Sequence, residues 1–213
     1  MNVNMKKFLD KLRTTIWRTS SSRYNAARRY KTKEIFSTIS LALLSAATIA
    51  VPIFEKTYVV SGSEADKALD WMSICLGLFL LVVSLIEWGS ATGIKAESLH
   101  RNAESLTHLR LKVELLLEKL GDGLSISWND IDCLREEYEQ VKDKCPYNHS
   151  PLDSNYFDVS RRNDAEFMQS IGNPSYGFCK ILWINLCWRI RGLEFFIIAW
   201  LVIALLGWKI FTL

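Results

Sequence analysis

Three long apolar runs constrain the fold of this 213-residue chain more than any other feature. They cover residues 35–54, 71–86 and 193–208, and Glu194 is the only charged residue within them. A hydrocarbon core about 30 Å thick is crossed by roughly 20 helical residues. The sequence therefore predicts an all-α membrane protein with two to three transmembrane helices, at 35–54, at 71–88 and, after an interfacial helix, within 178–213.

Basic residues before the first run predict the orientation of the chain. Ten lysines and arginines precede it, against two acidic residues, Asp10 and Glu34. Basic residues that flank a span stay in the cytoplasm. We expect a cytoplasmic N-terminus and an outer loop at 55–70.

Glu194 makes the third run the least regular of the three. A carboxylate at the inner end of a span can reach the headgroups or pair with an arginine, and this is the favoured interpretation. The alternative is an ion or proton site.

The region 89–145 predicts a cytosolic antiparallel helical hairpin. Its first helix has apolar residues at alternating spacings of three and four, with one polar interruption. These positions are Ala96, Leu99, Ala103, Leu106, Arg110, Val113, Leu117 and Leu120. The same spacing suggests that the second span leaves the membrane as one long helix, since it can be counted back through Thr92, Gly89, Leu85 and Val82. Ser127 and Asp130 are typical of the start of a second helix, which continues with Ile131, Leu134, Tyr138 and Val141.

Residues 1–34 predict a basic amphipathic helix with Phe8, Leu12 and Ile16 on one face. Trp17, Tyr24 and Tyr30 are expected to anchor it, either along the inner leaflet or on the hairpin. Its arginines could bind phosphate or RNA, but membrane topology alone requires basic residues here, so direct nucleic-acid binding is not favoured. Residues 146–177, which contain Pro146, Pro151 and Pro174, are expected to be an irregular cytosolic segment.

Catalytic motifs are missing from the sequence. It has no P-loop, GxSxG, HExxH or GxGxxG pattern, so we expect no enzyme activity, no cofactor and no metal site. Asn148, His149 and Ser150 with Asp153 could be a nucleophile with its base, but adjacent loop residues rarely converge in that geometry. A loop in which Asn148 and His149 hydrogen-bond the backbone or dock on the hairpin is the favoured interpretation.

Small and hydroxyl side chains within the spans suggest two further roles. Ala42, Ala46 and Ala50, and likewise Ser73 and Gly77, are spaced for close helix packing. Ser37, Ser45 and Thr48 share one arc of the first span. They would either line a narrow wet path or bond the carbonyls of their own helix.

The order of these elements resembles that of the SLATT domain family. The resemblance covers nearly the whole chain and is carried by a helix rich in Trp and Arg, two spans, a long cytosolic helix and the sequence REEYEQVKDKCPYNHSPLD. The subfamily associated with reverse transcriptases is the most similar, through Tyr138, Asn148, His149 and Asp153. Because the family is described as two-span, the third apolar run is either an addition or a membrane-associated helix.

The resemblance implies a membrane effector of a bacterial antiphage defence system. Such an effector is expected to oligomerise in the lipid bilayer and to permeabilise or depolarise it, causing growth arrest or cell death. The expected partner is a reverse transcriptase or a nucleotide-signalling protein encoded nearby. The alternatives are a non-conducting membrane scaffold that tethers a cytosolic partner and, ranked last, a membrane-embedded hydrolase that uses His149 and Asp153.

Overall fold

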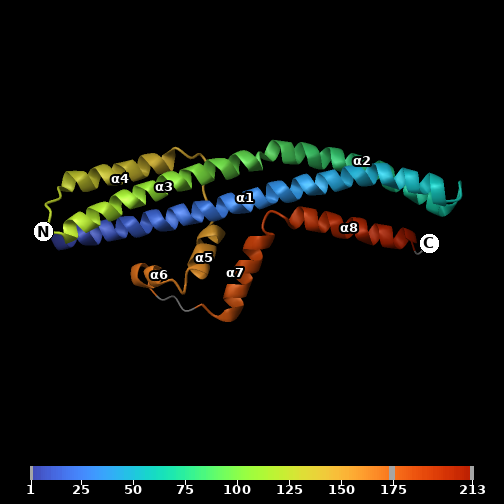
Figure 1. Ribbon diagram of the computed structural model, residues 1–213. Coiled ribbons are helices and arrows are strands. Elements are labelled where there is room, and N and C mark those ends of the chain that lie inside the picture. Colours follow the sequence, from blue (N-terminus) through green and yellow to red (C-terminus); the bar gives the residue numbers. More distant parts are fainter. Residues whose placement is uncertain (1, 173–175, 212–213) are drawn as a thin grey trace. The chain divides into compact units, whose positions relative to one another are not determined.

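The computed structural model describes residues 2–172 and 176–211, and all the regular structure in them is helical (Figure 1). The predictions made for Pro174 and for the last two residues, 212 and 213, lie outside the described residues. The helices divide between two compact units. Unit 1 contains the chain up to Tyr30 together with Ile94–Ile190, and unit 2 contains Lys31–Gly93 together with the chain from Arg191 onward.

Helix α1 runs from Asn2 to Tyr58 and contributes residues to both units. The predicted N-terminal helix and the first predicted span are therefore parts of one helix. Pro52 is the first proline of the chain and lies less than two turns from the end of α1. Nothing before it removes a backbone donor, so the helix continues.

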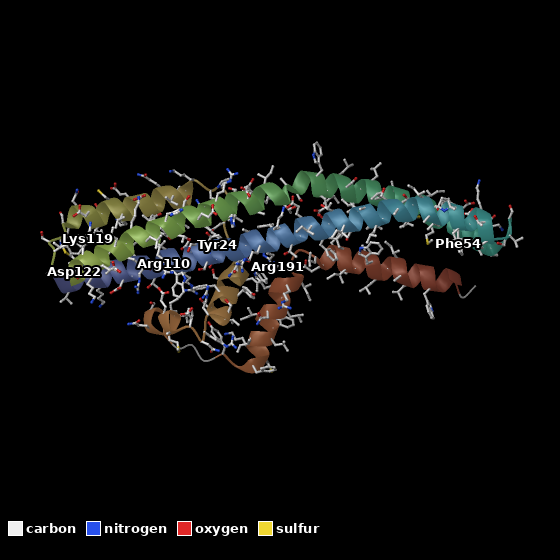
Figure 2. The ribbon with its side chains drawn as sticks, viewed as in Figure 1. Tyr24, Phe54, Arg110, Lys119, Asp122 and Arg191 are labelled. Carbon is white, nitrogen blue, oxygen red and sulfur yellow. The ribbon has the colours of Figure 1, made fainter. Side chains whose placement is uncertain are left out.

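Unit 1 contains the expected hairpin, formed by α3 (Thr92–Gly121) and α4 (Trp128–Asp143), which run antiparallel in Figure 1. Lys119 and Asp122 lie at the turn between them (Figure 2). The predicted cap of α4 is confirmed: Ser127 and Asp130 form a reciprocal capping box. In this arrangement each side chain satisfies a backbone amide that has no partner inside the helix.

The core of the hairpin also includes the first half of α1, which lies beside α3 in Figure 1. Burying each large apolar side chain contributes about 1.5–3 kcal/mol. The buried members are Met5, Leu9, Leu12, Ile16, Leu106, Leu109, Val113, Leu120, Ile131, Leu134, Tyr138 and Val141. The N-terminal helix was expected either along the inner leaflet or on the hairpin, and the structure shows it packed on the hairpin.

One detail of the predicted N-terminal helix is wrong. Phe8 is 37% exposed, because the face that meets the hairpin runs through Met5, Leu9 and Leu12 at alternating four- and three-residue spacing. Trp17 anchors the helix within unit 1, which is consistent with the predicted place on the hairpin. It is buried at 7% exposure against Phe157, where the ring centroids lie 5.2 Å apart in an edge-on contact.

The predicted irregular segment at 146–177 contains two short helices, α5 (Pro151–Ser160) and α6 (Ala165–Ser170). Pro151 occupies the first turn of α5, where its missing N–H costs nothing. The prediction of an irregular segment is wrong for these residues, because Ser150, Pro151 and Asp153 together start a helix. Helix α7 (Phe178–Ile190) follows and packs against α5.

Unit 2 contains the rest of α1, α2 (Glu64–Ser90) and α8 (Glu194–Phe211). In Figure 1 both α2 and α8 lie beside this part of α1. The connection between α1 and α2 is shorter than the predicted outer loop at 55–70, because both helices extend into that range. Phe54 lies near this end of α1 (Figure 2).

The long helix expected from the second span into the hairpin is interrupted at one residue. Ala91 adopts the left-handed conformation, with φ 48° and ψ 40°, between the end of α2 and the start of α3. Of the expected continuation of the buried face, Thr92 is buried, whereas Val82, Leu85 and Gly89 are exposed. One left-handed residue breaks the helical repeat, so the buried positions of α3 do not continue into α2. The buried residues of α2 are instead spaced by seven: Leu69, Leu76 and Val83.

Two helices of the described residues are long and apolar enough to span a membrane, one ending at Tyr58 and one starting at Glu64. Only 17% of the most apolar window of each is buried within the chain. A core helix of a soluble protein would be mostly buried, whereas most of each of these windows is exposed, as expected of helices that meet lipid. The third predicted span is present as the shorter apolar helix α8, and the chain has the all-α, two-span architecture of a membrane protein.

Glu194 starts α8, and its carboxylate accepts the backbone N–H of Gly192. A negative side chain in the first turn of a helix is stabilised by the free amides there. This arrangement favours a structural role for Glu194 over the ion or proton site. Farther along α8, the Trp200 indole N–H donates to the hydroxyl of Ser40 at 3.1 Å.

Candidate functional site

Asp153 is the centre of a buried polar cluster in unit 1. It lies in the first turn of α5, and its side chain is fully buried. Arg29 of α1 donates Nε–H to Oδ1 at 3.1 Å and Nη2–H to Oδ2 at 3.0 Å. A bidentate pair of this kind fixes the orientation of both side chains.

Ser150 and Trp188 also donate hydrogen bonds to Asp153. We call the four residues Arg29, Ser150, Asp153 and Trp188 the Asp153 cluster. Ser150 donates its backbone N–H and its hydroxyl to Oδ2, at 2.9 and 2.7 Å. The indole N–H of Trp188 on α7 donates to Oδ1 at 3.1 Å. Both carboxylate oxygens are therefore fully used, and one side chain joins α1, α5 and α7.

The electrostatics of Asp153 reflect these donors. Burial alone would raise the pKa of the Asp153 carboxyl, but the hydrogen bonds from Arg29 and Ser150 outweigh burial and hold the pKa below its usual value. Asp153 is thus ionised and structural. It is not arranged as the partner of a catalytic base, and the hydrolase interpretation loses its main support.

The other residues of the predicted cytosolic motif lie in different surroundings. Asn148 accepts the backbone N–H of His149 at 2.9 Å, as the loop interpretation expected. The Nδ1 atom of His149 is buried without a hydrogen-bond partner. Tyr138 is buried on α4, and its hydroxyl lies 3.2 Å from that of Thr19. Tyr138 is thus part of the three-helix core and is separate from the Asp153 cluster.

A second buried polar group involves Arg23, which is only 3% exposed. Its guanidinium donates to the side chain of Asn102 and to the carbonyl of Lys142. Asn102 in turn donates to the carbonyl of Val141 at 2.6 Å. Burial lowers the pKa of Arg23. These carbonyls lie in the last turn of α4, where unpaired backbone oxygens favour a positive charge.

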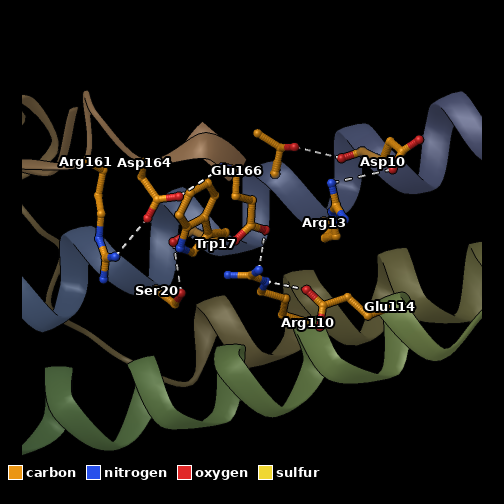
Figure 3. A network of polar contacts seen from close by, with 10 residues as sticks. Asp10, Arg13, Trp17, Ser20, Arg110, Glu114, Arg161, Asp164 and Glu166 are labelled. Atoms are coloured by element: carbon orange, nitrogen blue, oxygen red, sulfur yellow. Dashed lines mark hydrogen bonds and ion pairs between the residues drawn. The ribbon is translucent and has the colours of Figure 1, made fainter. Parts of the chain in front are cut away.

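A third polar network surrounds Trp17 and contains Arg110, the polar interruption in the predicted spacing of α3 (Figure 3). The Arg110 guanidinium lies 4.9 Å from the centre of the Trp17 ring and also pairs with Glu114 and Glu166. It thereby links α3 to α6. A charged residue at a core-facing position is tolerated here because it is paired on both sides.

The structural arginines were missed from the sequence, although a signal was present. Positions 9, 16, 23 and 30 of α1 are spaced by seven, so Arg23 occupies the same face as the buried Leu9 and Ile16. The basic residues were assigned to membrane orientation alone. Arg29 had no comparable signal, because its partner is 124 residues away in the sequence.

The predicted pore-facing residues of α1 do not share one environment. Ser37 is buried and donates its hydroxyl to the carbonyl of Glu34 at 3.0 Å, whereas Ser45 is exposed. Thr48 donates to the carbonyl of Ser45 at 2.7 Å. Ser37 and Thr48 thus make the local helix bonds that the alternative interpretation expected.

The predicted packing residues face outward within the described chain. Ala42, Ala46 and Ala50 on α1 and Gly77 on α2 are all exposed. Ser73 is half-buried and donates to the carbonyl of Leu69 at 2.9 Å. A face of small exposed residues is therefore available on α1.

The sequence model of the family described as "SMODS and SLOG-associating 2TM effector domain family 5" matches residues 5–207, which include every helix described above except the ends of α1 and α8. No curated protein and no solved structure matches the chain.

Proposed function

The chain belongs to the SMODS and SLOG-associating 2TM effector domain family 5, and we propose that it permeabilises or depolarises the membrane as an effector of a bacterial conflict system. The family supports the coarser statement, a membrane effector in conflict systems. The proposal adds that copies of the chain assemble in the bilayer and open a path for ions. Growth arrest or cell death would follow.

One observation carries the proposal: the apolar helices of unit 2 are largely unburied within a single chain. Their most apolar windows are only 17% buried. Lipid can cover large side chains such as Ile39, Leu43 and Ile53, which are more than half exposed. Small residues gain little from lipid but let two helix backbones approach closely.

We therefore assign the contact between copies to Ala42, Ala46 and Ala50. Substituting leucine for Ala46 adds bulk to this face and should prevent close approach. Leucine at Ile49, which is 64% exposed on the same helix, is the matched control because it leaves the volume nearly unchanged. Both variants should fold, since neither position is in the core.

The test is chemical cross-linking in membranes, combined with a potential-sensitive dye in cells that express each variant. We expect Ala46→Leu to reduce both the cross-linked oligomer and depolarisation, and Ile49→Leu to change neither. Depolarisation at the original level without cross-linked oligomer would contradict assembly through this face.

The orientation that we propose is N-terminus inside, in the bacterial inner membrane. It places the turn after α1 outside and unit 1 in the cytoplasm. In a cysteine-free background, Ser61→Cys should react with a membrane-impermeant maleimide in intact spheroplasts. Ser125→Cys, in the hairpin turn, should react only after lysis. The reverse pattern would contradict the orientation.

The proposed activating partner is a nucleotide-signalling protein or a reverse transcriptase encoded nearby. The family description names association with SMODS and SLOG proteins, which supports the first of these for this chain. Co-expression with each neighbouring gene product should change depolarisation if that product is the activator.

A second candidate is a non-conducting scaffold, favoured by one observation. Unit 1 has a large core of its own, formed by twelve buried residues of α1, α3 and α4. A unit of this kind could hold a partner without any ion path. The scaffold predicts partner capture with an intact membrane potential, whereas the effector predicts a collapsed one.

A further inference from the structure

Unit 1 contains a cavity of about 620 Å³ that the proposed function does not use. This volume is in the range of sites that hold small molecules. One wall is the polar face of α1, with Arg18 and three threonines. The facing wall is formed by His149 and the first turns of α5, including Asn155.

The threonines present acceptors to the cavity. The hydroxyls of Thr14 and Thr15 donate to the carbonyls of Asp10 and Lys11, at 2.9 and 2.8 Å. Because each hydroxyl proton is already used, only the oxygen lone pairs remain for a ligand. Such positions suit a molecule that carries hydroxyl or N–H donors.

Arg18, in contrast to the threonines, presents hydrogen-bond donors and a positive charge. Its guanidinium uses one N–H group on Asp158, and 47% of its side chain is exposed. The remaining N–H groups can bind an anionic group, which guanidinium binds well. It is the only permanently charged side chain among the residues that line the cavity.

His149 adds a polar atom that lacks a partner. Its Nδ1 is buried without a hydrogen bond, and a buried polar atom without a partner costs about 1–3 kcal/mol. Because this atom is closed to solvent, His149 contributes to the site as a ring that lines the cavity and can report on its occupant. The exposed amide of Asn155 offers both a donor and an acceptor on the same wall.

We propose that this cavity binds a small hydroxyl-bearing phosphate, with the anionic group on Arg18 and the hydroxyls on the threonine oxygens. The claim concerns binding alone, and it holds or fails independently of membrane permeabilisation. A free sugar phosphate and the headgroup of a phosphoglycerol lipid share this chemistry, and the experiment separates them.

The experiment uses the full chain in phosphatidylcholine nanodiscs with isotope-labelled histidine. The chain has three histidines, and His100 and His108 are exposed on α3, away from the cavity. Glucose 6-phosphate is titrated while the imidazole signals are recorded by NMR, and glucose is titrated in parallel. We expect a saturable shift of the His149 signal alone, with glucose binding at least tenfold more weakly.

Two variants that each add one negative charge, one inside the cavity and one outside it, test the binding site. Asn155→Asp places a carboxylate in the cavity and should weaken binding of glucose 6-phosphate roughly tenfold at low salt. Asn129→Asp makes the same change at an exposed helix position outside the cavity and should leave binding unchanged. Neither position is in the core, so both variants should fold.

A second arm replaces part of the lipid with phosphatidylglycerol, and the His149 signal is recorded before and after glucose 6-phosphate is added. A His149 shift in that arm that is insensitive to added glucose 6-phosphate would identify the headgroup as the occupant. A shift with glucose 6-phosphate in phosphatidylcholine identifies the free compound. The proposal is overturned if His149 responds in neither arm, if glucose binds equally well, or if Asn155→Asp has no effect.

Discussion

Asp153 shows how a residue that resembles a catalytic group can be structural. Its carboxylate accepts hydrogen bonds from Arg29, Ser150 and Trp188 in a fully buried site. The sequence indicated that Asp153 belongs with Asn148 and His149, but not what it binds. Its main partner lies far away along the chain, and no local pattern encodes such a pairing.

Asp153→Asn should destabilise unit 1 strongly. The substitution leaves Arg29 buried without a counter-charge, which costs about 3 kcal/mol or more. Asp132→Asn is the matched control, because Asp132 pairs with Arg135 on the exposed surface of α4 and should contribute little. Chemical unfolding of the full chain in micelles, followed by circular dichroism, measures both. Equal losses would contradict a special role for Asp153.

His149 should make the stability of unit 1 depend on pH. Burial, and then the positive charges of Arg23 and Arg18, lower its pKa below 6.5, while Asp153 partly opposes them. The unfolded chain therefore binds a proton at higher pH than the folded chain does. Stability should fall as pH decreases through 6.5, by at most about 1.4 kcal/mol per pH unit.

Comparing His149→Gln with His100→Gln isolates this contribution. Unfolding is measured on either side of pH 6.5 in the original chain and in both variants. We expect the pH dependence to shrink in His149→Gln and to persist in His100→Gln, because His100 is exposed. An unchanged pH dependence in His149→Gln would assign it to another group.

At the scale of elements, the break between α2 and α3 depends on one strained residue. Ala91 has φ 48°, a conformation that costs an L-residue about 1–2 kcal/mol. Glycine removes this cost but loses more chain entropy on folding. We expect Ala91→Gly to stabilise the chain by about 0.5–1 kcal/mol.

Ala68→Gly is the control for this substitution. Ala68 lies inside α2, where glycine costs about 1 kcal/mol. The midpoint of thermal unfolding in micelles should therefore rise for Ala91→Gly and fall for Ala68→Gly. A fall in both variants would mean that the left-handed conformation at Ala91 is not retained in solution.

The elements that the sequence predicted well are those with local signals. The cap at Ser127 and the buried positions of α3 and α4 follow from spacing and from residue type within a few positions. The break at Ala91 has no such signal, since alanine is a good helix former. The helix at Pro151–Ser160 also has a local signal, a serine followed by proline at the first helical position. Proline is equally typical of loops, so this signal is ambiguous.

At the scale of the whole molecule, the two units are built in different ways. Unit 1 buries its apolar side chains in a core of its own, whereas unit 2 leaves large side chains such as Ile49, Leu78 and Leu201 exposed. The membrane character of the chain was predictable, because hydropathy is a property of composition along the chain. The hydropathy of one chain does not specify what covers each exposed face of unit 2.

The exposed apolar side chains of unit 2 predict that the chain stays with the membrane when membranes are washed. Alkaline carbonate and high salt remove proteins that adhere to a membrane surface but not proteins that span it. We expect the full chain to remain in the pellet after both washes and to be released by detergent. Release by carbonate alone would contradict the two spans.

The most direct measurement of the central claim is conductance across a planar bilayer that contains the purified full chain. It is recorded with and without lysate from cells that carry the neighbouring genes and are infected by phage. We predict discrete current steps that appear with this lysate and are reduced in Ala46→Leu but not in Ile49→Leu. A silent bilayer under both conditions, with insertion verified, would contradict permeabilisation and favour the scaffold.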